Sequence, residues 1–286
     1  MPLKVHYAIS DGLLYPLVYH VARYRRKVVA KNLRLCFQDK TEAERKAIER
    51  AFYHQFCDNV VETVYGFGCS DEELRERVVF ANADEVDAAA KAAGGCIVML
   101  AHVGNWEWMS SCQQWFSSEV TELNVYRKAK QESTDRFILA IRARQGGAYV
   151  EKQRVLREMV RYRAEKRPIV LGLIADQKPR PEVTRTWVDF LHQETGFLDG
   201  GEMLAKKFNY PVFCLYVERP KRGYYKARFN LISMDPKQTE EGMITTAYAR
   251  NLEANVEQEP SLWLWTHNRF KWVKSERVKE LKSEEL

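Results

Sequence analysis

The segment CIVMLAHVGNWEW, residues 96–108, holds the residues whose types and spacing best suit chemistry. Its apolar run predicts a strand that delivers His102 to the carboxyl edge of a sheet, where the ligands of α/β proteins gather. A turn through Gly104 would follow, Asn105 would cap the next helix, and Glu107 would lie in the first turn of that helix. A histidine held by a carboxylate can take a proton from an alcohol, because the carboxylate fixes its tautomer and stabilises the imidazolium. We therefore predict that His102 and Glu107 form a catalytic pair.

Spacing alone does not single out this pair, since an acid follows a histidine by five residues twice, at His102 and at His6. On one continuous helix, five residues span about 500° of rotation, so His6 and Asp11 would point about 140° apart. A strand, a tight turn and a helix start can instead fold His102 back onto Glu107. No serine or cysteine lies in a nucleophile-elbow motif, which favours direct attack by a substrate hydroxyl. A strand-end histidine that is merely hydrogen-bonded to a carboxylate is the alternative, and these residues alone leave both open.

Asn105, three arginines and a second strand end supply candidate substrate contacts. Arg127 follows a predicted strand, and Arg142 and Arg144 close the helix after it. Guanidinium groups suit the phosphates of a lipid or of a phosphopantetheine arm, with a solvated surface as the alternative. Asp176 and Gln177 end a buried strand and share the edge of His102 if the two strands are parallel. Asp176 has no companion ligands nearby, so we expect a hydrogen-bonding scaffold there and no metal site.

The elements that must position these residues change character near residue 76. Helical signals fill residues 1–75, where Thr41 opens a capping box and Gly66 ends the long helix that follows it. Beyond this region short apolar strands alternate with helices, and such strands require a sheet covered on both faces. We predict an α/β domain over residues 76–273, with a mixed, centrally parallel sheet flanked by helices, and a charged tail at 274–286. The predicted strands are 78–81, 96–101, 122–126, 168–174, 186–191, 211–217 and 224–233, and the predicted helices lie near 84–92, 105–116, 130–145, 152–166, 199–208 and 240–257.

The N-terminal region carries the whole charge excess of the chain. The net charge is +6, and residues 1–34 alone hold seven basic side chains against one acid. An apolar stripe with interleaved tyrosines accompanies this charge, formed by Leu14, Val18, Val21 and Val28. A helix of this kind lies in the headgroup region of an anionic membrane, and a surface helix with a solvated basic face is the alternative. No apolar run approaches the roughly 20 residues that cross a bilayer, so we expect a membrane-associating region rather than a span.

The overall composition is that of an ordinary globular protein. The chain has 286 residues, 45% hydrophobic and 29% charged, which excludes disordered and collagen-like classes. Six cysteines without a CxxC pair or a zinc-like histidine spacing are expected to be free thiols, which places the soluble mass in the cytoplasm. The start of the chain lacks the pattern of a cleavable signal peptide.

An aromatic and basic cluster lies near the end of the chain, formed by Trp263, Trp265, His267 and Arg269. Tryptophan favours both tight cores and membrane interfaces, so burial and lipid contact stay open. We expect a structural role for His267, because no acid lies near it in the sequence.

Five ordered blocks between residues 23 and 272 resemble the late acyltransferases of lipid A biosynthesis, a lysophospholipid acyltransferase-like family. The blocks are RYRRKVVAKNLR, AHVGNWEW, YRK at 126–128, ADQ at 175–177 and PSLWLWTHNRFKW at 260–272. The resemblance implies a glycerolipid acyltransferase-like fold and a peripheral or monotopic enzyme of lipopolysaccharide and lipid metabolism on the cytoplasmic face of the inner membrane. It also implies that His102 and Glu107 are catalytic. The Phe-Leu-Gly turn of the family reads Phe190-Leu191-His192 here.

The resemblance further implies transfer of a lauroyl- or myristoyl-type chain from acyl carrier protein to a hydroxyl of a lipid A precursor. His102 would take the hydroxyl proton during attack on the thioester, and backbone amides near Gly104 and Asn105, or a nearby arginine, would stabilise the oxyanion. We expect no cofactor beyond the acyl-carrier co-substrate, and as partners the carrier protein, the lipid precursor and the anionic inner-membrane surface, but no nucleic acid. Two alternatives stay open, a lysophospholipid or other aminolipid acceptor, and a non-catalytic lipid-binding protein on the membrane surface.

Overall fold

The structure is a computed structural model that describes residues 1–128, 131–132, 136, 139 and 146–271. Several predictions fall on other residues. Most of the helix predicted near 130–145, with Arg142 and Arg144, lies outside the described residues, and so does the tail at 274–286.

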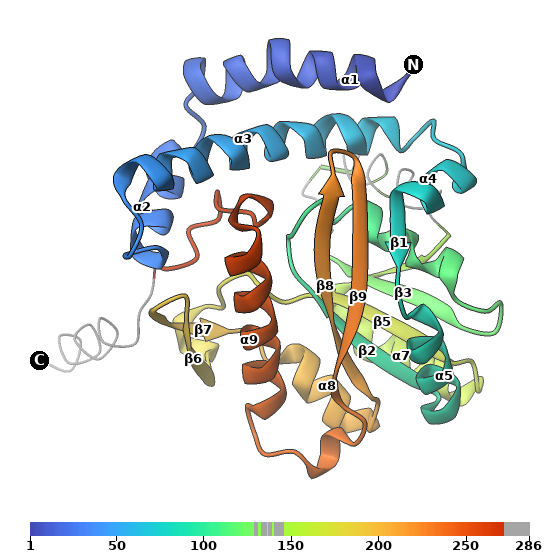
Figure 1. The fold of residues 1–286 in the computed structure, drawn as a ribbon. Coiled ribbons are helices and arrows are strands. Elements are labelled where there is room, and N and C mark those ends of the chain that lie inside the picture. Colours follow the sequence, from blue (N-terminus) through green and yellow to red (C-terminus); the bar gives the residue numbers. More distant parts are fainter. Residues whose placement is uncertain (129–130, 133–135, 137–138, 140–145, 272–286) are drawn as a thin grey trace, which may run out of the picture.

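A mixed sheet forms the centre of the described part of the chain, with the strand order β1-β9-β8-β2-β5-β3-β4 (Figure 1). All neighbouring strands are parallel except β8 and β9, which are antiparallel. The predicted mixed sheet with a parallel centre is therefore confirmed. The strands are β1 (Val78–Phe80), β2 (Gly95–Leu100), β3 (Thr121–Tyr126), β4 (Ala148–Glu151), β5 (Ile169–Ile174), β8 (Val212–Lys221) and β9 (Tyr224–Ser233). A separate antiparallel hairpin pairs β6 (Thr186–Phe190) with β7 (Gln193–Phe197).

Helices cover both faces of the sheet, as the apolar strands require. Cys96 and Met99 of β2 point to opposite faces, because side chains alternate along a strand. The Cys96 thiol lies against Val86 of α5 (Ala83–Ala93), whereas Met99 lies against Gly201 of α8 (Gly200–Phe208). The face of α8 is shared by α9 (Met243–Gln258), and α7 (Val155–Ala164) connects β4 to β5.

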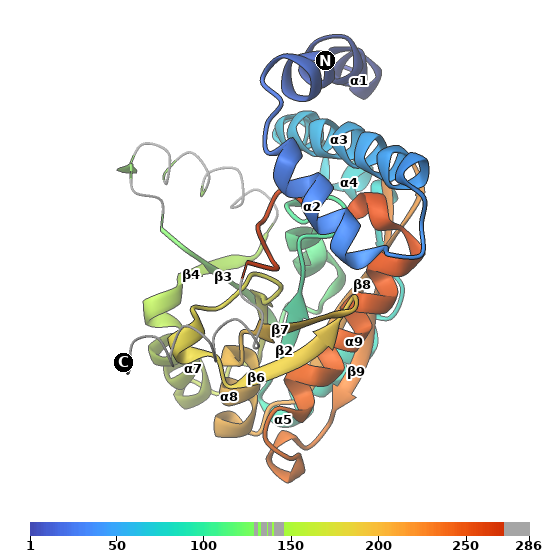
Figure 2. The ribbon, with the colours of Figure 1, turned by 90° about the vertical axis from the view of Figure 1, so that its left-hand side faces the viewer.

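Helices precede the first strand, as predicted. They are α1 (Leu3–Ile9), the π-helical segments Ser10–Leu14 and Pro16–Val21, α2 (Arg26–Cys36), α3 (Glu42–Tyr65) and α4 (Asp71–Arg77). Thr41 and Glu44 form the predicted capping box of α3, and Gly66 follows its last residue. Figures 1 and 2 both show α1 lying outside α3, at one end of the molecule.

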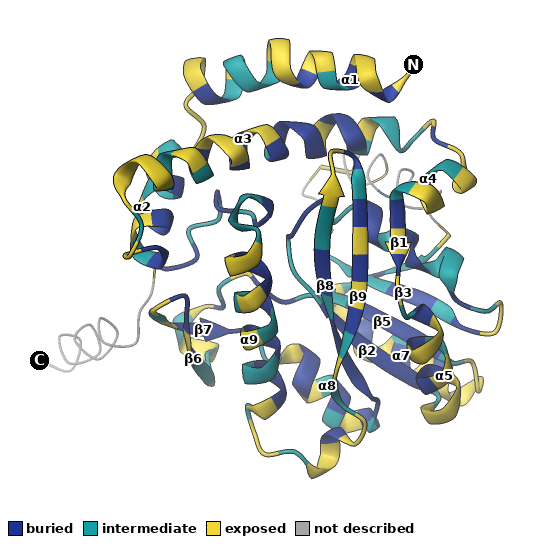
Figure 3. Ribbon diagram, viewed as in Figure 1, coloured by how far each residue is buried: buried dark blue, intermediate teal, exposed yellow. Residues whose placement is uncertain are grey.

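The helical stretch from Leu3 to Val21 turns its apolar side outward. Five aliphatic side chains that repeat every four residues are 37 to 74% exposed, and we call them the outward stripe: Val5, Ile9, Leu13, Leu17 and Val21. The inward side is polar instead. Ser10 donates a hydrogen bond to Asp58 of α3 at 2.7 Å, and Tyr7 donates one to Glu62 at 2.7 Å. Figure 3 shows this exposed outer surface along α1.

Of the four stripe members predicted from the sequence, only Val21 lies on the outward stripe. Leu14, Val18 and Val28 are half-buried, and Val18 packs against the core. Four residues of an α-helix rotate by about 40° more than one full turn, so a four-residue repeat drifts around the helix. The wider turns of the π-helical segments rotate less per residue and offset this drift. Alternating α and π turns therefore keep a four-residue repeat on one face, which a search for a 3.6-residue period misses.

Other differences are local. Strands β4 and β7 were not predicted, because β4 has only four residues and β7 begins with the polar Gln193 and Glu194. The segment predicted as a helix at 105–116 forms a 3-10 helix over Trp108–Trp115, so Glu107 lies just before this helix rather than in its first turn.

The turn of the β6–β7 hairpin carries backbone strain. Leu191 and His192 have φ angles of 51° and 61°. Positive φ at both central residues suits the twist of a two-residue hairpin, but side chains other than glycine clash there. The turn therefore forms without the glycine of the Phe-Leu-Gly pattern, at a local cost.

We predict that His192→Gly raises the free energy of unfolding by about 0.5–1 kcal/mol, because glycine adopts the left-handed region without a Cβ clash. Denaturant unfolding monitored by circular dichroism measures this change. Asp189→Gly in β6 is the control and should lower stability, since glycine weakens an extended strand. Equal loss of stability in both variants would contradict the strain.

Candidate active site

The pairing of β2 with β5 sets two polar side chains next to each other. Leu100 pairs with Ile174 in the parallel register, and each strand continues through an alanine to a polar residue. The backbone N–H of Ala175 donates to the carbonyl of Leu100 at 3.0 Å, which extends the ladder past the last paired residues. His102 and Asp176 therefore occupy equivalent positions at one edge of the sheet. The edge predicted for Asp176 and His102 is confirmed.

Asp176 is buried and accepts three hydrogen bonds. Its Oδ1 lies 2.7 Å from Nδ1 of His102, and its Oδ2 accepts the backbone N–H of His102 at 3.0 Å and the indole N–H of Trp263 at 2.9 Å. Burial would raise the pKa of Asp176, but the imidazole charge and these donors lower it below its usual value. Asp176 is therefore an ionised scaffold that holds His102.

The bond to Asp176 determines how His102 can act. Burial alone would lower the pKa of His102, but the Asp176 carboxylate outweighs burial and raises it. A carboxylate can only accept, so Nδ1 carries the proton and Nε2 keeps the lone pair of the neutral ring. The His102 side chain is 14% exposed, and the Trp106 ring packs edge-on against it at 5.2 Å between centroids. This arrangement suits a general base that is reached from the edge of the sheet.

Glu107 contributes to the same site through its charge. Its carboxylate raises the pKa of His102, although less than Asp176 does. The hydrogen bond to Nδ1, which the sequence led us to expect from Glu107, comes from Asp176. The role of Glu107 as the catalytic partner of His102 stays a prediction.

The turn after His102 requires glycine. Gly104 has a φ angle of 61°, and a Cβ there would lie 3.0 Å from the ring of Tyr225. The side-chain amide of Asn59 donates to the Gly104 carbonyl at 2.8 Å, and the Gly104 N–H donates to the carbonyl of Leu262 at 3.0 Å. The Gly104 amide is therefore already used. Among the groups expected to stabilise an oxyanion, the other amides of this turn and a nearby arginine stay a prediction.

A buried carboxylate of α3 binds this turn and holds it in place. Glu62 accepts hydrogen bonds from the Asn105 amide at 2.9 Å, the Tyr225 hydroxyl at 2.9 Å and the Tyr7 hydroxyl at 2.7 Å. Burial raises the pKa of Glu62, while these donors oppose the change. Asn105 was predicted to cap the next helix, but Glu107 is the residue just before the 3-10 helix. Asn105 instead closes the turn that precedes it, since its Oδ1 accepts the N–H of Trp108 at 3.2 Å. Its buried side chain positions the turn instead of facing the edge.

The aromatic cluster is buried and holds the site from the other side. Trp263 and Trp265 are at most 2% exposed, and Val103 forms a β-bridge with Trp263. The Nε2 of His267 accepts the backbone N–H of Lys178 at 3.2 Å, and burial lowers the pKa of His267 to about 4. His267 is therefore a neutral structural residue, as expected, although it lies close enough to Asp176 for their charges to interact.

The remaining candidates lie along the same edge. Arg127 follows the last residue of β3, Gln177 follows Asp176, and both side chains are exposed. The roles proposed for Arg142 and Arg144 fall on residues that the structure does not describe. All six cysteines are free and buried, which raises the pKa of their thiols. Such thiols are poor nucleophiles, in keeping with direct attack by a substrate hydroxyl.

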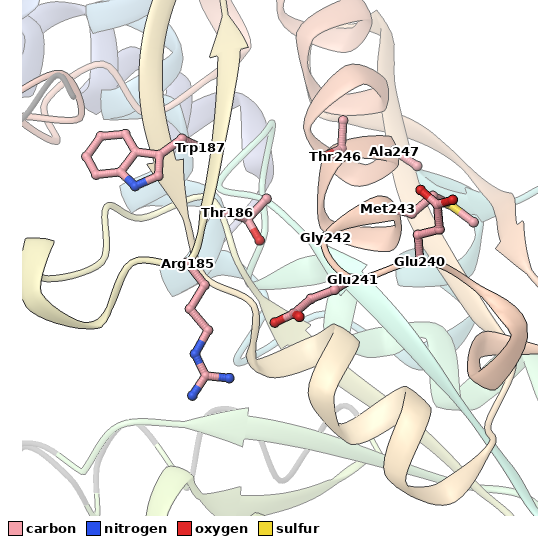
Figure 4. A pocket seen from close by; sticks show the side chains of 9 residues that line it. All are labelled: Arg185, Thr186, Trp187, Glu240, Glu241, Gly242, Met243, Thr246 and Ala247. Atoms are coloured by element: carbon pink, nitrogen blue, oxygen red, sulfur yellow. The ribbon is translucent and has the colours of Figure 1, made fainter. Parts of the chain in front are cut away.

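A surface groove of about 730 Å³ lies away from this chemistry (Figure 4). Its walls come from β6 and the start of α9, and the residues that line it include Arg185, Trp187, Glu241 and Met243. None of its lining residues belongs to the His102 edge, so we do not assign the reaction to it.

A comparison with protein families decides the class. The family described as bacterial lipid A biosynthesis acyltransferase matches residues 1–272. The chain belongs to this family. A search of curated proteins gave no match. Membership supports an acyltransferase, and the histidine at the sheet edge is the group in the described structure best suited to its chemistry.

Sequence analysis missed some residues of this candidate site. Glu62 and Asn59 lie on α3, about 40 residues before the turn that they support, and nothing local marks them. The sequence did contain a pattern that could have predicted the hydrogen bond between His102 and Asp176. The segments MLAH and LIAD each end an apolar strand with an alanine followed by a polar residue. Aligning the two alanines pairs position 102 with position 176.

We predict that Asp176→Asn lowers the rate of acyl transfer by about 10²–10⁴, because an amide does not hold the productive tautomer of His102. The base works when neutral, so the wild-type rate should rise with pH through the raised pKa of His102. Loss of the carboxylate lowers that pKa and moves the rise to lower pH. The pH dependence of kcat measures this shift, with the exposed Asp84→Asn as control. An unchanged profile in Asp176→Asn would remove the assignment.

Proposed function

We propose that the protein is an O-acyltransferase that moves a fatty acyl chain from acyl carrier protein to a hydroxyl of a lipid A precursor, at the cytoplasmic face of the inner membrane. The observation that carries the proposal is the His102 imidazole, bound through Nδ1 to buried Asp176 and left with Nε2 at the edge of the sheet. Membership of the lipid A acyltransferase family supports the class of substrates.

The chemistry follows from the state of the imidazole. Nε2 of His102 takes the proton of the acceptor hydroxyl as the oxygen attacks the thioester carbonyl. The C–O bond forms, the C–S bond breaks, and the imidazolium returns its proton to the leaving thiolate. Asp176 stabilises the imidazolium through Nδ1, and Glu107 adds a second negative charge nearby. The thioester and the alcohol become an ester and a thiol without any change of oxidation state, so the reaction needs no cofactor.

The oxyanion of the tetrahedral intermediate needs donors other than the Gly104 amide. The backbone N–H groups of Asn105 and Trp106 follow directly in the turn, and we assign them this role. Arg127 lies at the same edge and suits the phosphate of the carrier arm or of the lipid. Developing negative charge on the oxygen would strengthen these bonds in the transition state.

The outward stripe supports membrane association. Exposing Leu13, Leu17 and Val21 to water is unfavourable, and the polar inward side of this helix is already satisfied by α3. Exposed cations follow at Arg23 and Lys27, where they can meet anionic headgroups. Within the described residues, no helix combines the length and the apolar character that crossing a bilayer demands. We therefore propose that the stripe lies in the interface.

We predict that His102→Ala reduces acyl transfer by at least about 10²-fold without loss of folding. The assay offers radiolabelled acyl carrier protein with a lipid A precursor, with a lysophospholipid or with another aminolipid. Circular dichroism and thermal unfolding check the fold. Full activity of His102→Ala would refute the mechanism. Wild-type transfer to a lysophospholipid alone would change the acceptor, and no transfer to any of the three acceptors would favour a lipid-binding protein.

We predict that Leu13→Glu with Leu17→Glu weakens binding to phosphatidylglycerol vesicles by at least about tenfold, because two apolar side chains no longer enter the interface. Vesicle flotation measures the binding. Val183→Glu with Met203→Glu changes two equally exposed apolar residues elsewhere and serves as the control. A similar loss of binding in both double variants would argue against the stripe.

A further inference from the structure

Helix α7 and its flanks form the most basic stretch in the second half of the described chain. Residues 152–167 contain seven basic and two acidic side chains, a net charge of +5. Both acids are already engaged, because Glu158 pairs with Arg161 at 2.8 Å and Glu165 pairs with Arg161 and Arg167. The cations at the start of the helix have no ion pair within the described residues, and they are Lys152, Arg154 and Arg157.

These three cations lie at the unfavourable end of the helix. The amino end of a helix carries a partial positive charge, so each exposed cation in its first turn costs about 0.3–1 kcal/mol. Arg154 immediately precedes α7, and Arg157 lies in its first turn. Folding gains nothing from this placement, and a negatively charged partner would offset its cost.

Apolar side chains lie beside the cations. Leu156 and Val160, one helical turn apart, are 42% and 53% exposed. The helix is anchored by other residues, since Val155, Met159 and Tyr162 are buried. The exposed side of α7 therefore combines free positive charge with two aliphatic side chains. We call Lys152, Arg154, Leu156, Arg157 and Val160 the α7 face.

The topology brings the α7 face to the reacting edge. β2, β5, β3 and β4 are successive parallel strands, so their carboxyl ends share one edge. Lys152 directly follows β4, while His102 follows β2. Three strand spacings separate them laterally, roughly 14 Å. A partner on this face would therefore lie beside the reacting edge without covering His102.

We propose that the α7 face docks an acidic, amphipathic helix of the acyl carrier protein that delivers the thioester. This inference rests on the proposed function, in which the carrier is the donor. Negative side chains of the carrier would pair with Arg154 and Arg157, and its apolar side chains would cover Leu156 and Val160. The flexible arm would then extend along the edge past Arg127 to His102.

A lipid surface fits this face less well than a soluble protein does. Figures 1 and 2 both place α7 in the half of the molecule away from α1, where the outward stripe begins. One flat membrane does not contact both regions at once. If the stripe faces the membrane, the α7 face points to the aqueous side.

The test compares a charge reversal, Arg154→Glu with Arg157→Glu, with a control reversal of two exposed lysines elsewhere, Lys226→Glu with Lys237→Glu. Each enzyme receives acyl carrier protein thioester and, separately, the same chain on free pantetheine. We expect the first variant to raise the KM for the carrier thioester by at least about tenfold, with kcat and the KM for acyl-pantetheine unchanged. Its KM should also depend less on salt than that of the wild type.

The outcomes separate the two proposals. Transfer by the wild type with no change in the carrier KM of Arg154→Glu with Arg157→Glu overturns the docking surface and leaves the proposed function standing. A rise shared by acyl-pantetheine, or by the control variant, overturns it as well, as does loss of binding to anionic vesicles with an unchanged carrier KM. No transfer from the carrier thioester by the wild type would overturn the proposed donor and the docking surface together.

Discussion

The site depends on one buried interaction, the hydrogen bond between Nδ1 of His102 and the carboxylate of Asp176. Removing a carboxylate from water costs several kcal/mol, which Asp176 recovers only because the His102 ring, the His102 backbone and Trp263 all bind it. Its place is determined by the parallel register of β2 and β5, in which Leu100 pairs with Ile174. A slip of one residue would turn Asp176 to the other face of the sheet. The pairing of two apolar strands thus sets the tautomer of one imidazole.

A second constraint links the site to the N-terminal helices. Glu62 of α3 accepts hydrogen bonds from Asn105 in the turn and from Tyr7 on α1. One buried carboxylate therefore contacts both the reacting segment and the helix that carries the outward stripe. Like Asp176, it is tolerated inside because three donors bind it. The polar side of α1 is therefore not a solvent-facing surface. It is the side bound to the protein, which leaves the apolar side to face outward.

The sequence predicted which residues share the edge of the sheet better than it predicted their hydrogen-bond partners. Short apolar strands and the parallel-edge rule brought His102 and Asp176 together, because both depend on local patterns that a strand-helix alternation makes visible. The sequence did not indicate which carboxylate would bond to the imidazole, since Glu107 is nearer along the chain and side-chain direction depends on packing. The outward stripe was misassigned for a related reason: Ser10 and Tyr7 are satisfied by Asp58 and Glu62, 48 and 55 residues away. Partners at such separations leave no periodic trace.

The positions of the outward stripe and the α7 face match the two substrates of the proposed reaction. The proposed reaction joins a lipid acceptor held in a membrane to an acyl chain carried by a soluble protein, and these substrates approach from different sides. The outward stripe lies at one end of the molecule, whereas the α7 face lies in the opposite half, beside the carboxyl edge that holds His102 (Figure 2). Each region has a feature that is unfavourable for the isolated protein, exposed aliphatic side chains at one and cations at a helix amino end at the other. A protein can retain such unfavourable features when a binding partner offsets their free-energy cost. A membrane would offset the first feature and an anionic protein the second.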